Sequence, residues 1–280
     1  ALGSLCDTDN STTYKIASPP RLPRCIFSYQ RNSNELYVAN LSTGQNSIFA
    51  LRLYRFGLGT VWAEAEGGML YLTGGIYKGT RTRFSRDVVR TDTFRDFAVA
   101  KCTPMIESRN LHGAAYSQGF LYAIGGDSTY TCERLIVSED RWELISPQPL
   151  PCISMRVVVV QQSLYLLGGC NGYYSYSSEV QRLNLETLTW DIMSVKLPLL
   201  DANIVAFTSD QRVYVIIRET LYVFDPLNAR IEPVKNLNST VESSCGACYW
   251  SRGTLYCSSS EGKATRIEIG SLCASSQYST

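Results

Sequence analysis

The sequence predicts an all-β fold, a β-propeller of six blades, from three observations. A short strand motif with a central tyrosine recurs six times. Most copies precede an alternating strand and a turn, and the composition is rich in tyrosine (18) and glycine (20). The repeated tyrosines are Tyr37, Tyr71, Tyr122, Tyr165, Tyr214 and Tyr256, spaced 34 to 51 residues apart. That spacing suits a blade of about four short strands, so we expect residues 1–280 to form one propeller domain.

Each repeat has elements that a blade requires. Three copies of the tyrosine strand end in Gly-Gly, which suits a chain leaving a strand at a crowded position or with positive φ. An alternating strand, a turn and an aromatic residue follow, as in Val180–Leu185, Glu186–Leu188 and Trp190. We interpret the repeated Tyr, Gly and Trp residues as scaffold, because large aromatic side chains fill the space between blades.

Closure of the ring is expected to involve both ends of the chain. The last repeat supplies strands near 245–250, Thr254–Ser258 and 264–269, and then ends. The segment Thr13–Ala17 is expected to add the fourth strand of that blade, which would leave no open strand edge. Closure would bring two similar segments together, so a Cys6–Cys273 disulfide is conceivable.

The repeats resemble those of the kelch family. The resemblance rests on Gly74-Gly75, on Gly125-Gly126 with Trp142, and on Gly168-Gly169 with Trp190. It covers nearly the whole chain, although the repeats at Tyr37, Tyr214 and Tyr256 lack Gly-Gly. This divergent style is similar to kelch proteins of protists. The resemblance implies a six-bladed kelch-type propeller that binds other proteins.

Composition restricts the class of partner and the setting. The net charge is +1, from 26 basic and 25 acidic residues, so we expect no general attraction to nucleic acid. No apolar run approaches the roughly 20 residues that cross a bilayer, and no secretory signal is recognisable. The first residue is Ala1, which suits a processed protein or an excised domain.

The cysteines bear on the compartment. Their ten positions are irregular, which favours free, buried thiols and a cytoplasmic protein, with cytoskeletal association as one setting. Glycosylation motifs at Asn10, Asn40 and Asn238 favour secretion instead.

A search for catalytic chemistry predicts no enzyme, no cofactor and no metal. The only histidine, His112, is expected to be a packed and hydrogen-bonded side chain. Copper oxidases of similar architecture need more histidines. Cys245 and Cys248 lack the second cysteine pair of a zinc site, and the calcium-like segment at Asp7 lacks its central glycine.

The predicted partner-binding surface lies on one face of the ring. Loops after the second strands and links between blades emerge on the same face, because the strands of a blade alternate in direction. The candidate residues in these segments are Arg24, Lys78, Arg81, Arg83, Arg86, Arg109, Tyr130, Tyr173, Tyr174 and Tyr176. Arginine and tyrosine are typical anchors of protein interfaces.

The resemblance singles out two of these arginines. Kelch substrate adaptors often have an arginine 13 residues before the repeated tyrosine, at the channel rim, and Arg24 and Arg109 occupy such positions. The equivalent residues in the other repeats are Leu58, Cys152, Asp201 and Ser243, so a full cationic ring is absent. The alternative is that both arginines only hydrogen-bond a neighbouring loop carbonyl.

Three functional hypotheses follow. The first is a non-enzymatic interaction scaffold that binds a protein partner through the loop face, with a cytoskeletal assembly as one setting. The second is the substrate-recognition domain of a cullin-type ubiquitin ligase, a role that many kelch propellers serve beside a BTB or F-box segment. The third is a secreted glycan-binding or oxidative propeller.

Overall fold

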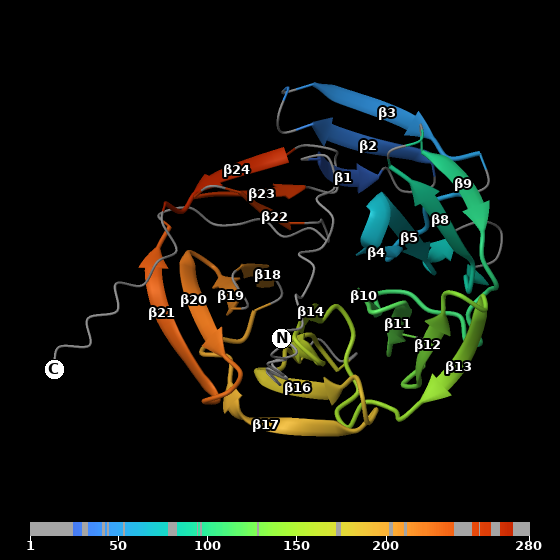
Figure 1. The fold of residues 1–280 in the computed structure, drawn as a ribbon. Helices are drawn as coiled ribbons and strands as arrows, with labels where there is room; N and C mark the ends of the chain where they lie inside the picture. The colour runs from blue at the N-terminus through green and yellow to red at the C-terminus, as the bar shows by residue number, and fades with distance from the viewer. Residues whose placement is uncertain are drawn as a thin grey trace, which may run out of the picture.

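The computed structural model shows an all-β propeller. It describes residues 25–29, 33–40, 43, 45–52, 54–77, 83–93, 95, 97–127, 129–171, 175–201, 204–209, 212–237, 248–251, 253–258 and 264–270. Six sheets of three or four antiparallel strands surround a central axis, with the first strand of each sheet innermost (Figure 1). The described residues contain one short 3₁₀ helix, η1 (Glu66–Gly68), and no α-helix.

Four sheets are complete four-stranded blades, which we call blades 2 to 5. Blade 2 comprises β4 (Val61–Ala65), β5 (Met69–Thr73), β8 (Val88–Asp92) and β9 (Ala98–Lys101). Blade 3 comprises β10 (Gly113–Ser117), β11 (Phe120–Ile124), β12 (Cys132–Ile136) and β13 (Arg141–Ile145). Blade 4 comprises β14 (Arg156–Val160), β15 (Ser163–Leu167), β16 (Glu179–Asn184) and β17 (Trp190–Lys196). Blade 5 comprises β18 (Ile204–Ser209), β19 (Arg212–Ile217), β20 (Thr220–Asp225) and β21 (Arg230–Asn236).

The first and last sheets have three strands each. The first comprises β1 (Cys25–Tyr29), β2 (Glu35–Asn40) and β3 (Asn46–Ala50). The last comprises β22 (Cys248–Ser251), β23 (Thr254–Ser258) and β24 (Ala264–Glu268), and β23 lies near β1. The prediction of an all-β propeller is therefore confirmed, and in the described part of the chain four sheets have the expected four strands. The predicted closing strand, Thr13–Ala17, and the Cys6–Cys273 pair lie outside the described residues.

The repeat register is confirmed. Every repeated tyrosine lies on the second strand of its sheet, on β2, β5, β11, β15, β19 and β23. The indoles of Trp142 and Trp190 donate hydrogen bonds to the carbonyl oxygens of Thr103 and Ser146, both at 2.8 Å. These carbonyls belong to the links that enter the two blades, so each tryptophan ties its blade to the segment before it.

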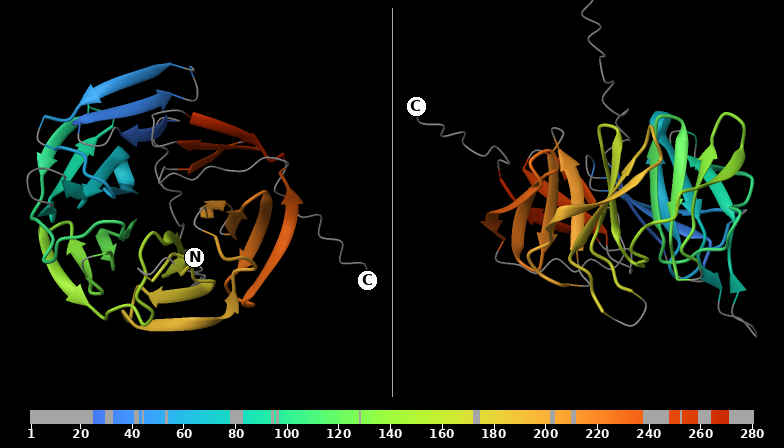
Figure 2. Two further views of the ribbon diagram at one scale, coloured as in Figure 1. Left: turned by 180° about the vertical axis from the view of Figure 1, so that it is seen from behind. Right: turned by 90° about the horizontal axis from the view of Figure 1, so that it is seen from below.

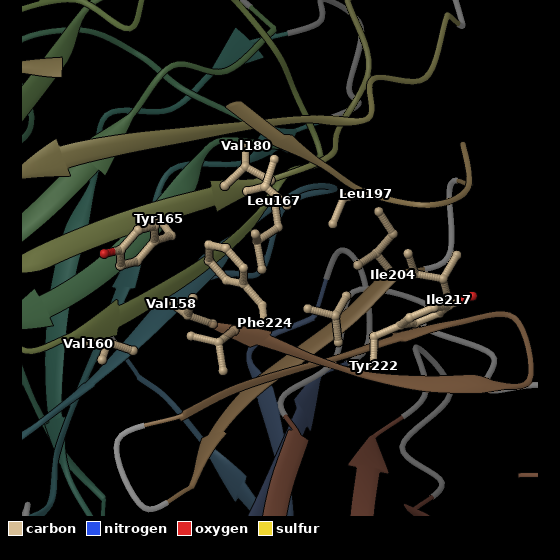
Figure 3. Packing of buried hydrophobic residues seen from close by; sticks show 13 residues of the cluster. Val158, Val160, Tyr165, Leu167, Val180, Leu197, Ile204, Ile217, Tyr222 and Phe224 are labelled. Carbon is tan, nitrogen blue, oxygen red and sulfur yellow. The ribbon is translucent and has the colours of Figure 1, made fainter. Parts of the chain in front are cut away.

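Apolar side chains fill the spaces between adjacent sheets. Figure 3 shows the cluster between blades 4 and 5, where Val158 and Tyr165 of blade 4 meet Ile204 and Phe224 of blade 5. Tyr165 and Phe224 form an edge-to-face pair with ring centroids 5.5 Å apart. Burial of such side chains contributes roughly 1.5–3 kcal/mol each, so the contacts between sheets supply much of the stability.

The Gly-Gly pairs have positive φ and lie against a neighbouring segment, the two properties that the sequence predicts for them. Gly74 has φ +63°, and a Cβ there would lie 2.3 Å from the carbonyl oxygen of Arg109. Gly169 has φ +92°, and its Cβ would lie 2.7 Å from the carbonyl oxygen of Ile153. Any other residue would therefore be strained and would push the incoming link away.

Candidate protein-interaction face

Loops and links interlock on one side of the ring, as the alternating strand directions predict. The amide of Gly75 donates to the carbonyl of Arg109 (2.8 Å), and the amide of Arg109 donates to the carbonyl of Ser85 (2.9 Å). Ile153 and Cys170 exchange two main-chain hydrogen bonds of 2.8 and 2.9 Å in the same way. We call the described parts of 54–60, 74–87, 102–112, 125–131, 146–155, 168–178 and 197–203 the loop face. The right-hand view of Figure 2 shows the ring from its edge, with loops projecting from either side.

Arg109 is at the centre of this interlocking and is completely buried. Its Nε donates to Glu133 Oε1 (2.9 Å), and both side chains have no exposed surface. Its two terminal nitrogens donate to the carbonyls of Gly125 (2.7 Å) and Thr131 (2.6 Å) and to the Thr131 hydroxyl (2.8 Å). The expectation that Arg109 contacts a partner directly is therefore corrected: a guanidinium with these internal partners is not accessible.

Glu133 was missed by the sequence analysis. Besides Arg109, its carboxylate accepts hydrogen bonds from the amides of Ile106 (2.7 Å) and Glu107 (3.3 Å). Gln181 has the same role in blade 4, where its side-chain amide accepts from and donates to the main chain of Leu150 (2.9 and 2.8 Å). Both residues precede Arg-Leu on the third strand, so aligning the repeats on that pair would have revealed them.

His112 is packed and hydrogen-bonded, as predicted. Its Nε2 lies 2.8 Å from the Thr73 hydroxyl, and its ring is buried. Burial, with a smaller effect of the nearby Arg109, lowers the pKa of His112 to about 3. The ring is therefore neutral at physiological pH. Asn110 is also buried, and neither of its side-chain polar atoms has a hydrogen-bond partner among the described residues.

Four of the predicted contact residues are exposed on the loop face. Arg83 and Arg86 lie at the β7 (Arg83–Phe84) end of a short hairpin, and Tyr130 is 66% exposed. Tyr176 is also exposed, beside a β-bridge to Cys170. The remaining predicted residues, Arg24, Lys78, Arg81, Tyr173 and Tyr174, lie outside the described residues.

The structure adds apolar residues to this face that the sequence analysis did not select. They are Phe84, Ile106, Leu199 and Leu200, and all are exposed. Phe84 ends the two-residue strand β7, and the other three lie outside the strands, so no regular alternation of buried and exposed residues surrounds them. No sequence pattern marks such residues as exposed, and only the path of the loops shows it.

The described cysteines and acidic residues form no metal-binding group. Cys102, Cys132, Cys152 and Cys170 are free thiols. Burial raises the pKa of Cys132 to about 11 and that of Cys152 to about 12, so these thiols are poor nucleophiles at neutral pH. Cys245 lies outside the described residues. Within them, no helix is long and apolar enough to cross a membrane.

The fold and its repeats define a class, the β-propellers built from short sequence repeats. A family profile described as Kelch motif matches residues 151–194, which cover the link into blade 4 and most of that blade. The chain therefore contains a kelch motif, and its repeats are similar to those of kelch-repeat proteins.

Curated relatives whose names refer to kelch match parts of the chain. Kelch repeat and BTB domain-containing protein 2 of Cowpox virus (strain Brighton Red) is 33% identical over 178 residues, covering 62% of this chain and 28% of that relative. Human Kelch-like protein 25 is 26% identical over 132 residues, covering 42% of this chain and 22% of that relative. The chain therefore spans less than a third of these relatives. The expected likeness to protist proteins stays a prediction.

A solved structure supports the fold independently. The structure of YjhT superposes with a TM-score of 0.69 over 92% of this chain and 97% of that one. Because the two sequences are 13% identical, the likeness extends to the fold alone.

Proposed function

We propose that this propeller is a non-enzymatic scaffold that binds a protein partner through the loop face. The proposal rests on exposed side chains whose main chain is held in place by buried hydrogen bonds. Tyr130 and Ile106 are exposed, while the main chain beside both is held by the buried Arg109–Glu133 pair. A pre-ordered surface loses little conformational entropy on binding, which favours affinity.

Affinity capture with matched variants tests this proposal. Tagged protein would be expressed in its own cells, and co-purifying proteins would be quantified by mass spectrometry. We expect Ile106→Ala with Tyr130→Ala to reduce the main partner's recovery by about tenfold, as expected for loss of interface anchors. Leu227→Ala is the control, because Leu227 is 82% exposed in the β20–β21 turn at the other side of the ring. Equal recovery with both variants would contradict the proposal.

A second candidate function is substrate recognition within a cullin-type ubiquitin ligase. The names of the viral relatives include a BTB domain, and this chain matches 28% of the Cowpox virus protein's length. Recovery of a cullin in the same capture would favour this function. Recovery of actin, tubulin or their associated proteins would instead favour a cytoskeletal scaffold in the cytoplasm.

We also propose that the whole chain forms one ring in which the N-terminal segment 13–17 pairs with β24, the outer strand of the last sheet. The three-stranded last sheet and the proximity of β23 to β1 support this proposal. Deletion of residues 1–17 should then lower the midpoint of thermal unfolding. An unchanged midpoint would contradict strand closure.

A further inference from the structure

The outer edge of the first sheet is open in the described part of the chain. β3 is the last strand of that sheet, and no described residue between β3 and β4 adds a fourth strand to it. Figure 1 shows β3 at the periphery of the ring, where blades 2 to 5 each place their fourth strand. The third strands of blades 2 to 5 have three buried residues each, whereas β3 has none. β3 therefore presents an unpaired strand edge.

The ladder between β2 and β3 shows which main-chain groups face outward. The amide of Asn40 donates to the carbonyl of Gln45 (2.8 Å), and the amide of Leu51 donates to the carbonyl of Asn34 (2.7 Å). Hydrogen-bonded pairs alternate with non-hydrogen-bonded pairs along an antiparallel ladder. Three residues of β3 therefore point both their amide and their carbonyl away from β2: Asn46, Ile48 and Ala50.

β3 lacks the charged residues that protect the other sheet edges. Outside the small two-stranded sheet of β6 (Ile76–Tyr77) and β7, the other described outer strands are β9, β13, β17, β21 and β24, and each carries at least one charged side chain. β21 also contains Pro233, and β17 has a bulge in its pairing. Such charges, prolines and bulges discourage pairing between sheet edges. In contrast, residues 36–51, which include all of β3, contain no charged side chain.

One face of β3 holds the strand in position, while the other face is open. Phe49 packs against Phe97 of the β8–β9 turn, with ring centroids 4.1 Å apart. Because side chains alternate along a strand, Ile48 points to the opposite face, where it is 59% exposed. Pairing of this edge with another strand would thus require little reordering of β3, which favours binding.

The spacing of the outward-facing residues suits a second copy of the same strand. In antiparallel pairing about a two-fold axis through Ile48, this residue faces Ile48 of the second copy, and Asn46 faces Ala50 of the second copy. Each outward amide then meets an outward carbonyl, and no like charges oppose one another along the strand, because β3 has none. We propose that two copies of this chain associate through β3, so that their first sheets form one continuous sheet.

The geometry of this pairing sets the size and strength of the assembly. Pairing about a two-fold axis stops at a dimer, because each copy has then used its β3 edge. The contact involves five residues of β3 in each copy, and we expect it to bury less than the roughly 1,200 Å² of a standard interface. The dimer is therefore expected to be weak and to depend on concentration. This association goes beyond the proposed function and does not use the loop face.

Sedimentation velocity of the whole chain at increasing concentration tests this inference. The protein would be measured up to about 1 mM, where weak complexes become populated. We expect the wild type to shift from monomer towards dimer. Ile48→Lys should weaken dimerisation by about tenfold, because it removes the central apolar pair and places two like charges opposite each other. Ile48→Pro should weaken it as well, since proline removes the outward amide without removing a hydrogen bond to β2.

The matched control is Ile192→Lys. Ile192 is also an isoleucine on an outer strand, 49% exposed on β17, where Asp191 places a charge beside it. We expect this control to dimerise like the wild type. Hydrogen–deuterium exchange gives a second measurement, because the amides of residues 46–50 should exchange more slowly at high than at low concentration in the wild type, but not in Ile48→Lys.

Three outcomes would overturn the inference. The first is a wild type that stays monomeric over the whole concentration range, and the second is a dimer that I48K and I192K weaken equally. The third is a monomeric wild type that loses a captured protein on I48K substitution, since a strand of a different protein would then occupy the edge. I106A/Y130A should dimerise like the wild type, so failure of this inference and failure of the proposed function are distinguishable.

Discussion

Removal of the Arg109 side chain is the sharpest test of the structural argument. In Arg109→Met the apolar stem is retained, but Glu133 keeps a buried carboxylate without its counter-ion. The carbonyl of Gly125 loses its donor at the same time, and the carbonyl of Thr131 keeps only the amide of Gly125 as a donor. Breaking a buried ion pair from one side costs about 3–5 kcal/mol, because an uncompensated charge is left in the interior.

The assay is equilibrium unfolding in urea with linear extrapolation to water. Arg182→Met is the control, because Arg182 forms an arginine–carboxylate pair with Asp191 across β16 and β17 of blade 4 but is partly exposed to solvent. An exposed pair contributes about 0–1 kcal/mol, so the control should change stability little.

A double variant adds a second measurement. In Arg109→Met with Glu133→Gln the buried charge is gone, and the glutamine carbonyl can still accept from the amide of Ile106. We expect the double variant to be more stable than Arg109→Met alone. If Arg109→Met lowered the free energy of unfolding no more than Arg182→Met, the stabilising role of the buried Arg109–Glu133 pair would be refuted. Direct contact between Arg109 and a partner would then be the better hypothesis.

Three further predictions concern the interior. Gly74→Ala should lower the free energy of unfolding in urea more than Gly119→Ala. Both glycines have positive φ, but only a Cβ at Gly74 would lie 2.3 Å from a carbonyl oxygen. Equal decreases in the free energy of unfolding would show that the link containing Arg109 can move aside. The pKa of His112 is lowered in the folded state, so its contribution to stability is present above about pH 6.5 and is lost as the pH falls towards 3. His112→Gln should therefore flatten the fall in stability across that window, and an NMR titration of the ring near its ordinary pKa would contradict this. The buried Cys132 and Cys152, with pKa values of about 11 and 12, should resist iodoacetamide at pH 8 until the protein is denatured. A count of ten reactive thiols after denaturation would exclude the hypothesis of a secreted propeller, and a lower count would support it.

The propeller could be predicted because its signals are local and repeated. A strand with a central tyrosine, followed by Gly-Gly and a turn, recurs along the chain, and each copy forms the same local structure. The positive φ at Gly74 and the indole hydrogen bonds of Trp142 and Trp190 follow from residue type at a fixed place in the repeat. The number of strands per blade did not follow from these markers, because the repeat at Tyr214 lacks Gly-Gly and still forms a complete four-stranded blade.

The exposure of side chains on the loop face could not be predicted from the repeat. Position in the repeat selected Arg109 as a rim residue, but burial depends on Glu133 and Thr131, which lie 24 and 22 residues further along the chain. The exposure of Phe84 and Ile106 likewise depends on how separate loops pack against one another. By itself, the sequence determined the all-β repeat, the positions of its strands and the face on which the loops lie. Only the tertiary structure decided which charged and apolar side chains of that face reach solvent, because exposure is set by contacts between segments that are distant in the chain.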